Sequence, residues 1–228
     1  MISEKFGKEF FNGDKKIPGT YGSYGYRYEQ LYPKFLVLAK TIQSLFNPKR
    51  ILDIGCAKGF LVKAFRDIGI EAYGVDISKY CLSTAPKDVK GYLIRSDLES
   101  SKLPFHDDSF DFVTLLVTIE YINNTENVLL ETSRVVKSGG YLLLKTLIKE
   151  DAKDEFRINI HPKIFWINKF ADYNFIYTDN YTSLLEEELV RTHMEDKVLI
   201  RNLRKPIAKL LLPLIRRRKI RYLLFKKR

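Results

Sequence analysis

One stretch, residues 50–78, constrains the possible fold more than any other part of the chain. It begins with a short apolar run that carries a single acid, Asp53, and continues into a glycine-bearing turn, Gly55–Gly59. A helical segment follows, and a second apolar run then leads directly into Asp76. A strand, a turn, a helix and a second strand within about thirty residues have the size of one parallel crossover. The stretch therefore predicts an α/β fold with a parallel sheet.

The turn between the first strand and the helix is suited to a ligand. Gly55 and Gly59 allow the backbone to approach a bound molecule closely, and the N–H groups at the start of the helix are free to donate to it. Asp76, at the end of the second strand, offers two acceptor oxygens to the two hydroxyls of a ribose. The sequence thus predicts a pocket for a nucleoside-containing cofactor at the carboxyl edge of the sheet. The alternative is a plain strand and turn without a ligand.

The spacing of the turn residues excludes two common phosphate-binding loops. The dinucleotide fingerprint requires glycine at the positions of Gly55, Ala57 and Phe60, and the phosphate loop requires Lys and then Ser or Thr after its last glycine. The turn instead resembles motif I of the class I S-adenosylmethionine-dependent methyltransferases. That motif is D-x-G-x-G-x-G, and this chain has D-I-G-C-A-K-G. Ala57 replaces the middle glycine and still allows a fairly close approach.

Two further blocks extend the resemblance over residues 50–147. The first reads L-P-F-H-D-D-S-F-D from Leu103 and is similar to the small-molecule "methyltransferase type 11"-like subgroup. It leads into an apolar run at residues 110–117, which predicts a strand buried on both faces. The second block reads E-T-S-R-V-V-K-S-G-G from Glu131, and in the family it supports the fold rather than catalysis.

The resemblance implies a fold, a cofactor and a set of site residues. The fold is a Rossmann-like, doubly wound, mostly parallel seven-stranded sheet with helices on both faces, and the cofactor is S-adenosyl-L-methionine. Asp97 is expected to accept a hydrogen bond from the adenine amino group, with a turn-capping role as the alternative. The residues expected to bind the cofactor are Asp53, Gly55, Cys56, Ala57, Gly59, Phe60, Asp76, Ile77, Asp97, Leu98, Leu116 and Val117.

Two residues are candidates for catalysis. Tyr121 stands where the family often has His, so the proton-accepting role of that His is not carried over. An unperturbed tyrosine, with a pKa of about 10, is a poor base near neutral pH. His161 is the first candidate for a general base because a histidine titrates near neutral pH. The alternative is a loop histidine that is satisfied by the backbone. No group of residues has the spacing of metal ligands.

The flanks of the cofactor half, residues 50–147, are expected to meet the substrate. Residues 1–30 are rich in tyrosine and glycine, which predicts an arm or lid over the cofactor edge, with a packed arm that touches no ligand as the alternative. Residues 31–194 form the predicted methyltransferase domain, in which residues 148–194 supply substrate-side elements. The candidate substrate-binding residues are Tyr21, Tyr24, Tyr26 and Trp166, and Trp166 also suits packing.

The net charge of +11 is concentrated in a predicted C-terminal tail, residues 195–228. Residues 197–228 hold 13 Lys and Arg and no acid, whereas residues 1–196 have a net charge of −2. This distribution excludes a generally basic body that wraps nucleic acid. A basic amphipathic tail suits an anionic membrane surface, and ordinary packing or contact with nucleic-acid phosphates are the alternatives.

The remaining composition argues for a cytoplasmic protein with possible peripheral contact to the inner membrane face. No apolar run approaches the roughly 18 residues of a membrane span, and no signal-peptide pattern begins the sequence. Two cysteines, Cys56 and Cys81, do not form a disulfide framework or a metal set. We therefore expect both to be small, partly buried thiols.

Three functions are compatible with the sequence. The first is methyl transfer to a small or lipid-linked metabolite, with sugars among the candidates. Residues 117–121 lack the N/D-P-P-Y/F motif, which argues against methylation of adenine N6 or glutamine N5. The second is an RNA or DNA methyltransferase whose basic tail holds phosphates. The third is a scaffold that keeps the methyltransferase fold without catalysis.

Overall fold

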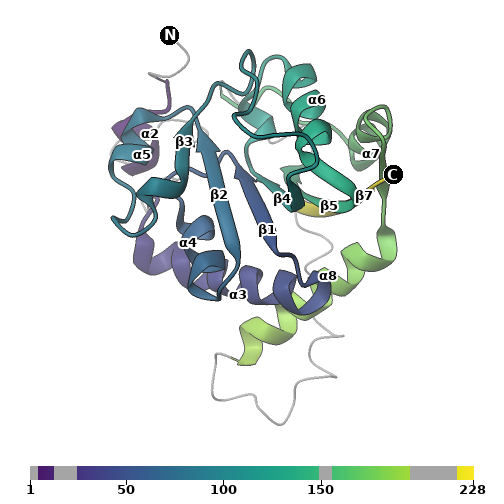
Figure 1. The fold of residues 1–228 in the computed structure, drawn as a ribbon, viewed down its shortest axis with the longest axis horizontal. Coiled ribbons are helices and arrows are strands. Elements are labelled where there is room, and N and C mark those ends of the chain that lie inside the picture. Colours follow the sequence, from purple (N-terminus) through teal and green to yellow (C-terminus); the bar gives the residue numbers. More distant parts are fainter. Residues whose placement is uncertain (1–4, 13–24, 149–155, 196–219) are drawn as a thin grey trace.

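The protein is seen in a computed structural model that describes residues 5–12, 25–148, 156–195 and 220–228. Within these residues the strands form one sheet of seven. They are β1 (Arg50–Ile54), β2 (Glu71–Asp76), β3 (Leu93–Arg95), β4 (Phe110–Leu116), β5 (Val136–Leu147), β6 (Phe175–Tyr177) and β7 (Ile220–Lys227). Their order is β3-β2-β1-β4-β5-β7-β6, and only β7 runs antiparallel to its neighbours (Figure 1). The predicted mostly parallel, seven-stranded sheet is therefore confirmed.

Helices cover both faces of this sheet (Figure 1). One face carries α3 (Tyr28–Phe46), α4 (Phe60–Asp67) and α8 (Asp179–Glu195), and the other carries α6 (Thr125–Val135) and α7 (Lys163–Ala171). Two short helices, α2 (Lys8–Asn12) and α5 (Lys79–Ser83), lie near the end of β3. Short 3₁₀ turns are η2 (Lys90–Tyr92) and η3 (Ile119–Tyr121). The doubly wound arrangement expected from the sequence is thus present.

Strand β5 illustrates how the sequence forms two apolar cores. Leu142 and Leu144 belong to the core under α6 and α7, whereas Leu143 belongs to the core under α3, α4 and α8. Successive side chains on a strand point to opposite faces, so a continuous apolar run is needed when both faces are covered. All three leucines are fully buried. The central strands of the sheet therefore form a rigid platform for the loops at their carboxyl ends.

The predicted separate tail at residues 195–228 is wrong for its last part, because Ile220–Lys227 is a strand within the sheet. It pairs with β5 on one side and with β6 on the other. Leu223 belongs to one core and Leu224 to the other, so this segment is apolar because it is a central strand. Residues 196–219, with most of the predicted membrane-binding or nucleic-acid-binding segment, lie outside the described residues. Among the described helices, none combines the length and apolarity that crossing a membrane requires.

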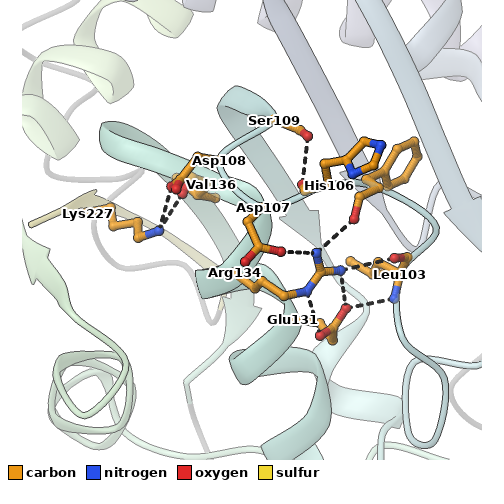
Figure 2. A network of polar contacts seen from close by, with 10 residues as sticks. Leu103, His106, Asp107, Asp108, Ser109, Glu131, Arg134, Val136 and Lys227 are labelled. Carbon is orange, nitrogen blue, oxygen red and sulfur yellow. Dashed lines mark hydrogen bonds and ion pairs between the residues drawn. The ribbon is translucent and has the colours of Figure 1, made fainter.

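The side chain of Arg134 ties helix α6 to the turn that precedes β4 (Figure 2). Its Nε and Nη2 donate to the two carboxylate oxygens of Glu131, at 2.9 and 2.6 Å. Its remaining N–H groups reach Asp107 at 2.8 Å and two turn carbonyls, those of Phe105 at 2.8 Å and Leu103 at 3.0 Å. All five donors of the guanidinium are therefore used. The contacts of Arg134 explain the block from Glu131 as structural, as the resemblance implied, and they show that this block also holds the turn formed by the block from Leu103.

The same turn is also held from the far side by β7. Lys227 Nζ donates to Asp108 Oδ1 at 3.1 Å and to the carbonyl of Val136 at 2.6 Å (Figure 2). Lys227 thereby links the end of β7 to the starts of β4 and β5. Arg134 and Lys227 thus both bind the turn before β4, so this strand is anchored at its start.

Candidate functional site

A cavity of about 260 Å³ opens at the carboxyl edge of the sheet. Its lining follows the strand order, from the loop after β3, across the ends of β2, β1, β4 and β5, to the start of β7. We call one part the cradle end, formed by Asp53, Gly55, Ala57, Asp76, Ile77, Asp97 and Leu98. We call the other part the far end, formed by Lys34, Phe35, Leu38, Lys145, Leu189 and Tyr222.

Gly55 and Gly59 determine the backbone of the cradle end. Their φ angles are +78° and +68°, a region that glycine adopts without strain. A Cβ added to Gly55 would lie 2.1 Å from Oγ1 of Thr118, and one added to Gly59 would lie 2.7 Å from a methyl carbon of Leu93. Ala57, between them, also has a positive φ of 50°, which is uncommon for a residue with a side chain. The turn therefore has no room for larger residues at either glycine.

Asp76 is fixed in place by two backbone donors. The N–H of Ala57 donates to Oδ2 and the N–H of Ser78 donates to Oδ1, each at 2.8 Å. Burial raises the pKa of this carboxyl above its ordinary value, although the N–H donors oppose that shift. Each oxygen keeps a second lone pair that can accept a hydroxyl from a ligand. The side chain is therefore oriented as a double acceptor at the cavity wall.

Asp53 is the second buried acid of the cradle end. Burial raises its pKa to about 7, against the opposing effect of a hydrogen bond from Thr114 Oγ1 at 2.7 Å. The negative charge of Asp76 adds to the shift, because like charges disfavour ionisation of both. The side chain of Asp53 thus couples the end of β1 to β4.

Asp97 has the turn-capping role that the sequence left as the alternative. Its Oδ1 accepts from the N–H of Glu99 and its Oδ2 accepts from the hydroxyl of Ser100, both at 3.0 Å. Asp97 therefore caps its own turn. It also lines the cavity next to Leu98, so a ligand in the cradle end has access to a carboxylate beside an apolar surface.

The end of β4 lies between the cradle end and the far end. Leu116, Val117 and Thr118 line the cavity here. Val117 has a φ of +52°, which is an outlier for a β-branched residue. Its N–H donates to the carbonyl of Lys145 at 2.7 Å, which holds the strained conformation. Strain of this kind costs about 1–3 kcal/mol and tends to occur at functional sites.

An aromatic group closes the cavity beside Tyr121. The ring of Tyr121 contacts the edges of Phe6 and Phe10, with centroids 5.8 and 5.6 Å apart. Its hydroxyl accepts a hydrogen bond from Nε of Arg157 at 3.3 Å. Tyr121 lines the cavity together with Phe6, Phe10, Phe11 and Tyr26. The described part of the N-terminal arm therefore packs as an aromatic cluster and also forms a wall of the cavity.

Comparisons with known proteins agree with this geometry. A family model described as a methyltransferase domain matches residues 52–144. A malonyl-[acyl-carrier protein] O-methyltransferase of Hamiltonella defensa is 30% identical over 193 residues, which cover 81% of this chain and 73% of that protein. This chain belongs to the class I S-adenosylmethionine-dependent methyltransferase family. The family resemblance of the sequence blocks is therefore confirmed.

Two other curated relatives of the methyltransferase match over shorter regions. A malonyl-[acyl-carrier protein] O-methyltransferase of Buchnera aphidicola is 30% identical over 152 residues, or 64% of this chain and 54% of that protein. A ubiquinone biosynthesis O-methyltransferase of Thiobacillus denitrificans is 30% identical over 103 residues, or 43% and 44%. The chain thus spans about half the length of these curated relatives.

Two solved structures share the fold of the methyltransferase. The YcgJ protein of Bacillus subtilis is 20% identical, with a TM-score of 0.59 over 86% of this chain and 99% of that chain. A geranyl diphosphate C-methyltransferase of Streptomyces coelicolor is 17% identical, with a TM-score of 0.57 over 95% and 90%. At these identities the likeness shows the fold alone.

The cradle end of the methyltransferase fits the cofactor of its family. Gly55 and Ala57 bring the backbone of the turn to the cavity wall, and Thr118 and Leu93 leave no room for a side chain at Gly55 or Gly59. A nucleoside needs acceptors for its ribose hydroxyls and its adenine amino group, and Asp76 and Asp97 supply two carboxylates to the cavity wall. Ile77 and Leu98 add apolar surface for a ring. No cluster of possible metal ligands is found among the described residues.

Several predicted cofactor residues support the cradle without lining it. Cys56 is buried behind the turn, against the backbone of Gly74, where an added Cβ would lie 2.7 Å from its sulfur. Phe60 is buried and stacks on Tyr26, with ring centroids 5.1 Å apart. The side chains of Cys56 and Phe60 therefore shape the turn from behind.

The predicted substrate and base residues do not gather at one place. Trp166 is fully buried in the core under α6 and α7 and is not part of the cavity lining, so its predicted role in the substrate wall is corrected to core packing. His161 also lies outside the lining, and its ring stacks on Phe165 at a centroid distance of 3.9 Å. Tyr26 lines the cavity, whereas Tyr21 and Tyr24 lie outside the described residues.

The far end contains the residues that sequence reasoning missed. Its members come from α3, β5, α8 and β7, which are far apart in the chain. Lys145 and Tyr222 are cross-strand partners on β5 and β7. No motif marks either residue, and Tyr222 lay inside the segment interpreted as a tail. Only the pairing of β7 with β5 brings them to the site.

Proposed function

We propose that this methyltransferase transfers a methyl group from S-adenosylmethionine to an oxygen of a small, lipid-linked or carrier-linked acceptor with an apolar body. The observation that carries the proposal is the continuity of one cavity. The cradle end, the end of β4 and the far end, with its apolar residues Phe35, Leu38 and Leu189, share a single space. A nucleoside cofactor in the cradle end would thus lie beside room for a second molecule.

The cradle end supplies a group for each part of the cofactor. Asp76 would accept the ribose hydroxyls, and Asp97 would accept the adenine amino group, with Ile77 and Leu98 against the ring. The backbone of Gly55 and Ala57 would approach the methionine part. When bound, the cofactor supplies an activated methyl group on a sulfonium that leaves readily.

The chain's own residues then have to align the acceptor and keep water out. Holding two reactants in the right geometry can supply a large part of the rate enhancement. Leu116 and Val117 form the floor at which the two ends of the cavity meet. Phe6 and Phe10 cover this place together with Tyr121. Nε of Arg157 donates to the hydroxyl oxygen of Tyr121, which helps to hold this side chain at the wall of the cavity.

The relatives support an oxygen acceptor. Both groups of curated relatives are named O-methyltransferases, for a malonyl-carrying protein and for ubiquinone biosynthesis. The sugar acceptor considered from the sequence has no support from these names, and we do not propose it. The apolar residues of the lining favour an acceptor with a hydrocarbon or aromatic part.

Calorimetric titration of the purified chain tests the proposal. S-adenosylmethionine and S-adenosylhomocysteine should bind with micromolar dissociation constants, and NAD should not bind. Asp76→Asn should weaken S-adenosylhomocysteine by about tenfold or more, because a hydrogen bond to a charged group contributes about 1.5–3 kcal/mol. Asp88→Asn is the matched control, since Asp88 is an exposed partner of Lys63. Failure of both sulfur nucleosides to bind would overturn the proposal in favour of a scaffold.

A further inference from the structure

Lys145 occupies an unusual position for a lysine. It lies in β5, paired with Leu116 of β4 on one side and with Tyr222 of β7 on the other. By the alternation of the strand it shares a face with Tyr141 and Leu143, the face that α3 and α8 cover. Its side chain is half-buried and lines the far end of the cavity. A central strand with helices on both faces normally carries apolar residues there.

Among the described residues, Lys145 has no acidic partner for its charge. Its Nζ lies 5.1 Å from the centroid of the Tyr222 ring, which provides a cation–π contact. In the described part of the chain no carboxylate forms an ion pair with Lys145, although acids are abundant elsewhere in the cavity wall. Lysine is rarely buried without a partner, because removing its charge from water is unfavourable. The position therefore suits a partner that arrives from outside.

The charges of the lining are divided between the two ends of the cavity. Three acids of the lining, Asp53, Asp76 and Asp97, are at the cradle end, and a fourth, Glu99, follows Asp97 and Leu98 in the chain. The two cations of the described lining, Lys34 of α3 and Lys145 of β5, are at the far end. Lys34 is exposed, so it adds positive potential at the mouth. An anion is thus repelled from the cradle end and attracted to the far end.

We propose that Lys145 binds an anionic group of the acceptor, a carboxylate or a phosphate, while the apolar part of the acceptor packs on Phe35, Leu38 and Leu189. This inference rests on the proposed function, because it assumes that the cradle end takes the cofactor. Neighbouring strands are about 5 Å apart, so Lys145 lies about one strand spacing beyond the end of β4. The anion is held on the side of β4 opposite to the cofactor, and the acceptor oxygen lies between them.

A second lysine on the same two strands offers a matched control. Lys226 of β7 pairs across the strands with Tyr141 of β5, just as Lys145 of β5 pairs with Tyr222 of β7. Its Nζ lies 5.8 Å from the centroid of the Tyr141 ring. Lys226 is exposed at the opposite edge of the sheet and is not part of the cavity lining. Substitution of Lys226 removes the same kind of charge and ring contact without touching the site.

The test measures binding of three probes with the same apolar chain to the protein saturated with S-adenosylhomocysteine. The probes are octanoate, octyl phosphate and octanol, and calorimetry gives each dissociation constant. We expect one or both anions to bind about tenfold more tightly than octanol, as a charge-assisted hydrogen bond would provide. Lys145→Met should remove this preference, Lys145→Arg should keep most of it, and Lys226→Met should leave it unchanged. The stronger of octanoate and octyl phosphate identifies the anion.

Three results would overturn the inference while leaving the proposed function intact. One is that the saturated wild type binds neither anion more tightly than octanol. Another is that Lys145→Met and Lys226→Met reduce the preference equally, which indicates a non-specific effect of charge. The third is that Lys145→Met weakens S-adenosylhomocysteine itself about tenfold, which would assign Lys145 to the carboxylate of the cofactor. Failure of the wild type to bind S-adenosylhomocysteine, in contrast, contradicts the proposed function.

Discussion

The cradle end and the far end of the cavity are assembled from the chain in different ways. The cradle end comes from one stretch, residues 53–98, in which the end of each strand lies within a single crossover of the next. The far end takes Lys34 from α3, Lys145 from β5, Leu189 from α8 and Tyr222 from β7. Backbone conformation determines the cradle end, through positive φ angles at Gly55 and Gly59. Side chains determine the far end.

This difference separates a part of the site that tolerates few substitutions from a part whose residues can be changed one at a time. A backbone turn tolerates few substitutions, because its dihedral angles and close contacts exclude most residues. A wall of side chains on separate elements can change one residue at a time while the sheet remains. The comparison predicts that substitutions at the two ends have separable effects on the cofactor and on the acceptor.

The largest effect is expected at the cradle end, for Gly55→Ala. A side chain at a positive φ costs about 1–2 kcal/mol, and overpacking against Thr118 costs about 1–3 kcal/mol. The turn would leave its binding conformation, and the dissociation constant of S-adenosylhomocysteine should rise about a thousandfold. Calorimetry measures this dissociation constant. Gly91→Ala is the control, because an added Cβ there meets no atom within 4 Å. Equal effects of the two variants would contradict the assignment of the cradle.

Arg134→Lys should lower the stability of the fold without a specific effect on the cradle end or the far end of the cavity. Lysine cannot replace the five donors of Arg134, so two turn carbonyls and part of the buried Glu131 carboxylate lose their partners. We expect the free energy of unfolding to fall by about 3 kcal/mol in urea titration. The dissociation constant of S-adenosylhomocysteine should change less than about twofold below the unfolding transition. A selective loss of cofactor binding would instead show that the contacts of Arg134 support the cradle end.

Glu120 provides a pH-dependent test of the junction between the two ends. It is fully buried in η3, its Oε1 accepts from the N–H of Leu147 at 3.0 Å, and burial raises its pKa to about 7. The folded state therefore binds a proton that the unfolded state has already released above about pH 4.5. The proton on Glu120 contributes its full stabilisation of the fold at low pH, and this contribution is lost as the pH rises toward and through about 7.

The corresponding measurement compares wild type with Glu120→Gln. Between about pH 5 and pH 8 the wild type should lose about 2 kcal/mol of unfolding free energy relative to Glu120→Gln, which cannot ionise. Denaturant titrations at several pH values provide the comparison. Parallel pH profiles of the two proteins would show that Glu120 keeps an ordinary pKa. The other buried acids titrate in both proteins, so the difference isolates Glu120.

The smallest effect is expected at the far end, for Leu189→Ala. Leu189 is half-buried and lines the cavity, so its truncation removes about 1 kcal/mol of apolar contact with a ligand. Octanol should bind about fivefold more weakly to the S-adenosylhomocysteine complex, with cofactor affinity unchanged. Leu184→Ala on the same helix is the control, because Leu184 is 43% exposed and does not line the cavity. Loss of cofactor affinity in Leu189→Ala would contradict the prediction that substitutions at the two ends have separable effects.

The sequence predicted the fold and the cradle end because both are encoded locally. Gly55 and Asp76 stand at the ends of apolar runs that predict strands, and the family resemblance adds Asp97, Leu116 and Val117. The structure brings all five to one cavity. The left-handed φ of Val117 was not foreseen, because valine carries no signal for it and the contact with Lys145 that holds it is non-local.

The sequence did not predict the far end, because its residues become neighbours only through the pairing of strands in the sheet. The predicted basic amphipathic tail, residues 195–228, included residues 220–227, which the structure shows as β7. A short apolar run fits a strand and a helix equally well, and only pairing decides between them. Trp166 was misplaced for a related reason, since an aromatic residue in a substrate-side segment suits a pocket wall and a core alike.

The position of β7 also determines the order in which the molecule can be completed during synthesis. Strand β6 leaves the ribosome well before β7, yet it can join the sheet only through β7, which lies between it and β5. Until residue 220 and the residues after it have emerged, β5 is an open edge whose backbone groups are available to other chains. The nascent protein can therefore hold a formed nucleoside cradle while the wall that carries Tyr222 is still missing. Cofactor binding at that stage would stabilise a partly built sheet during the interval when it is most exposed to aggregation.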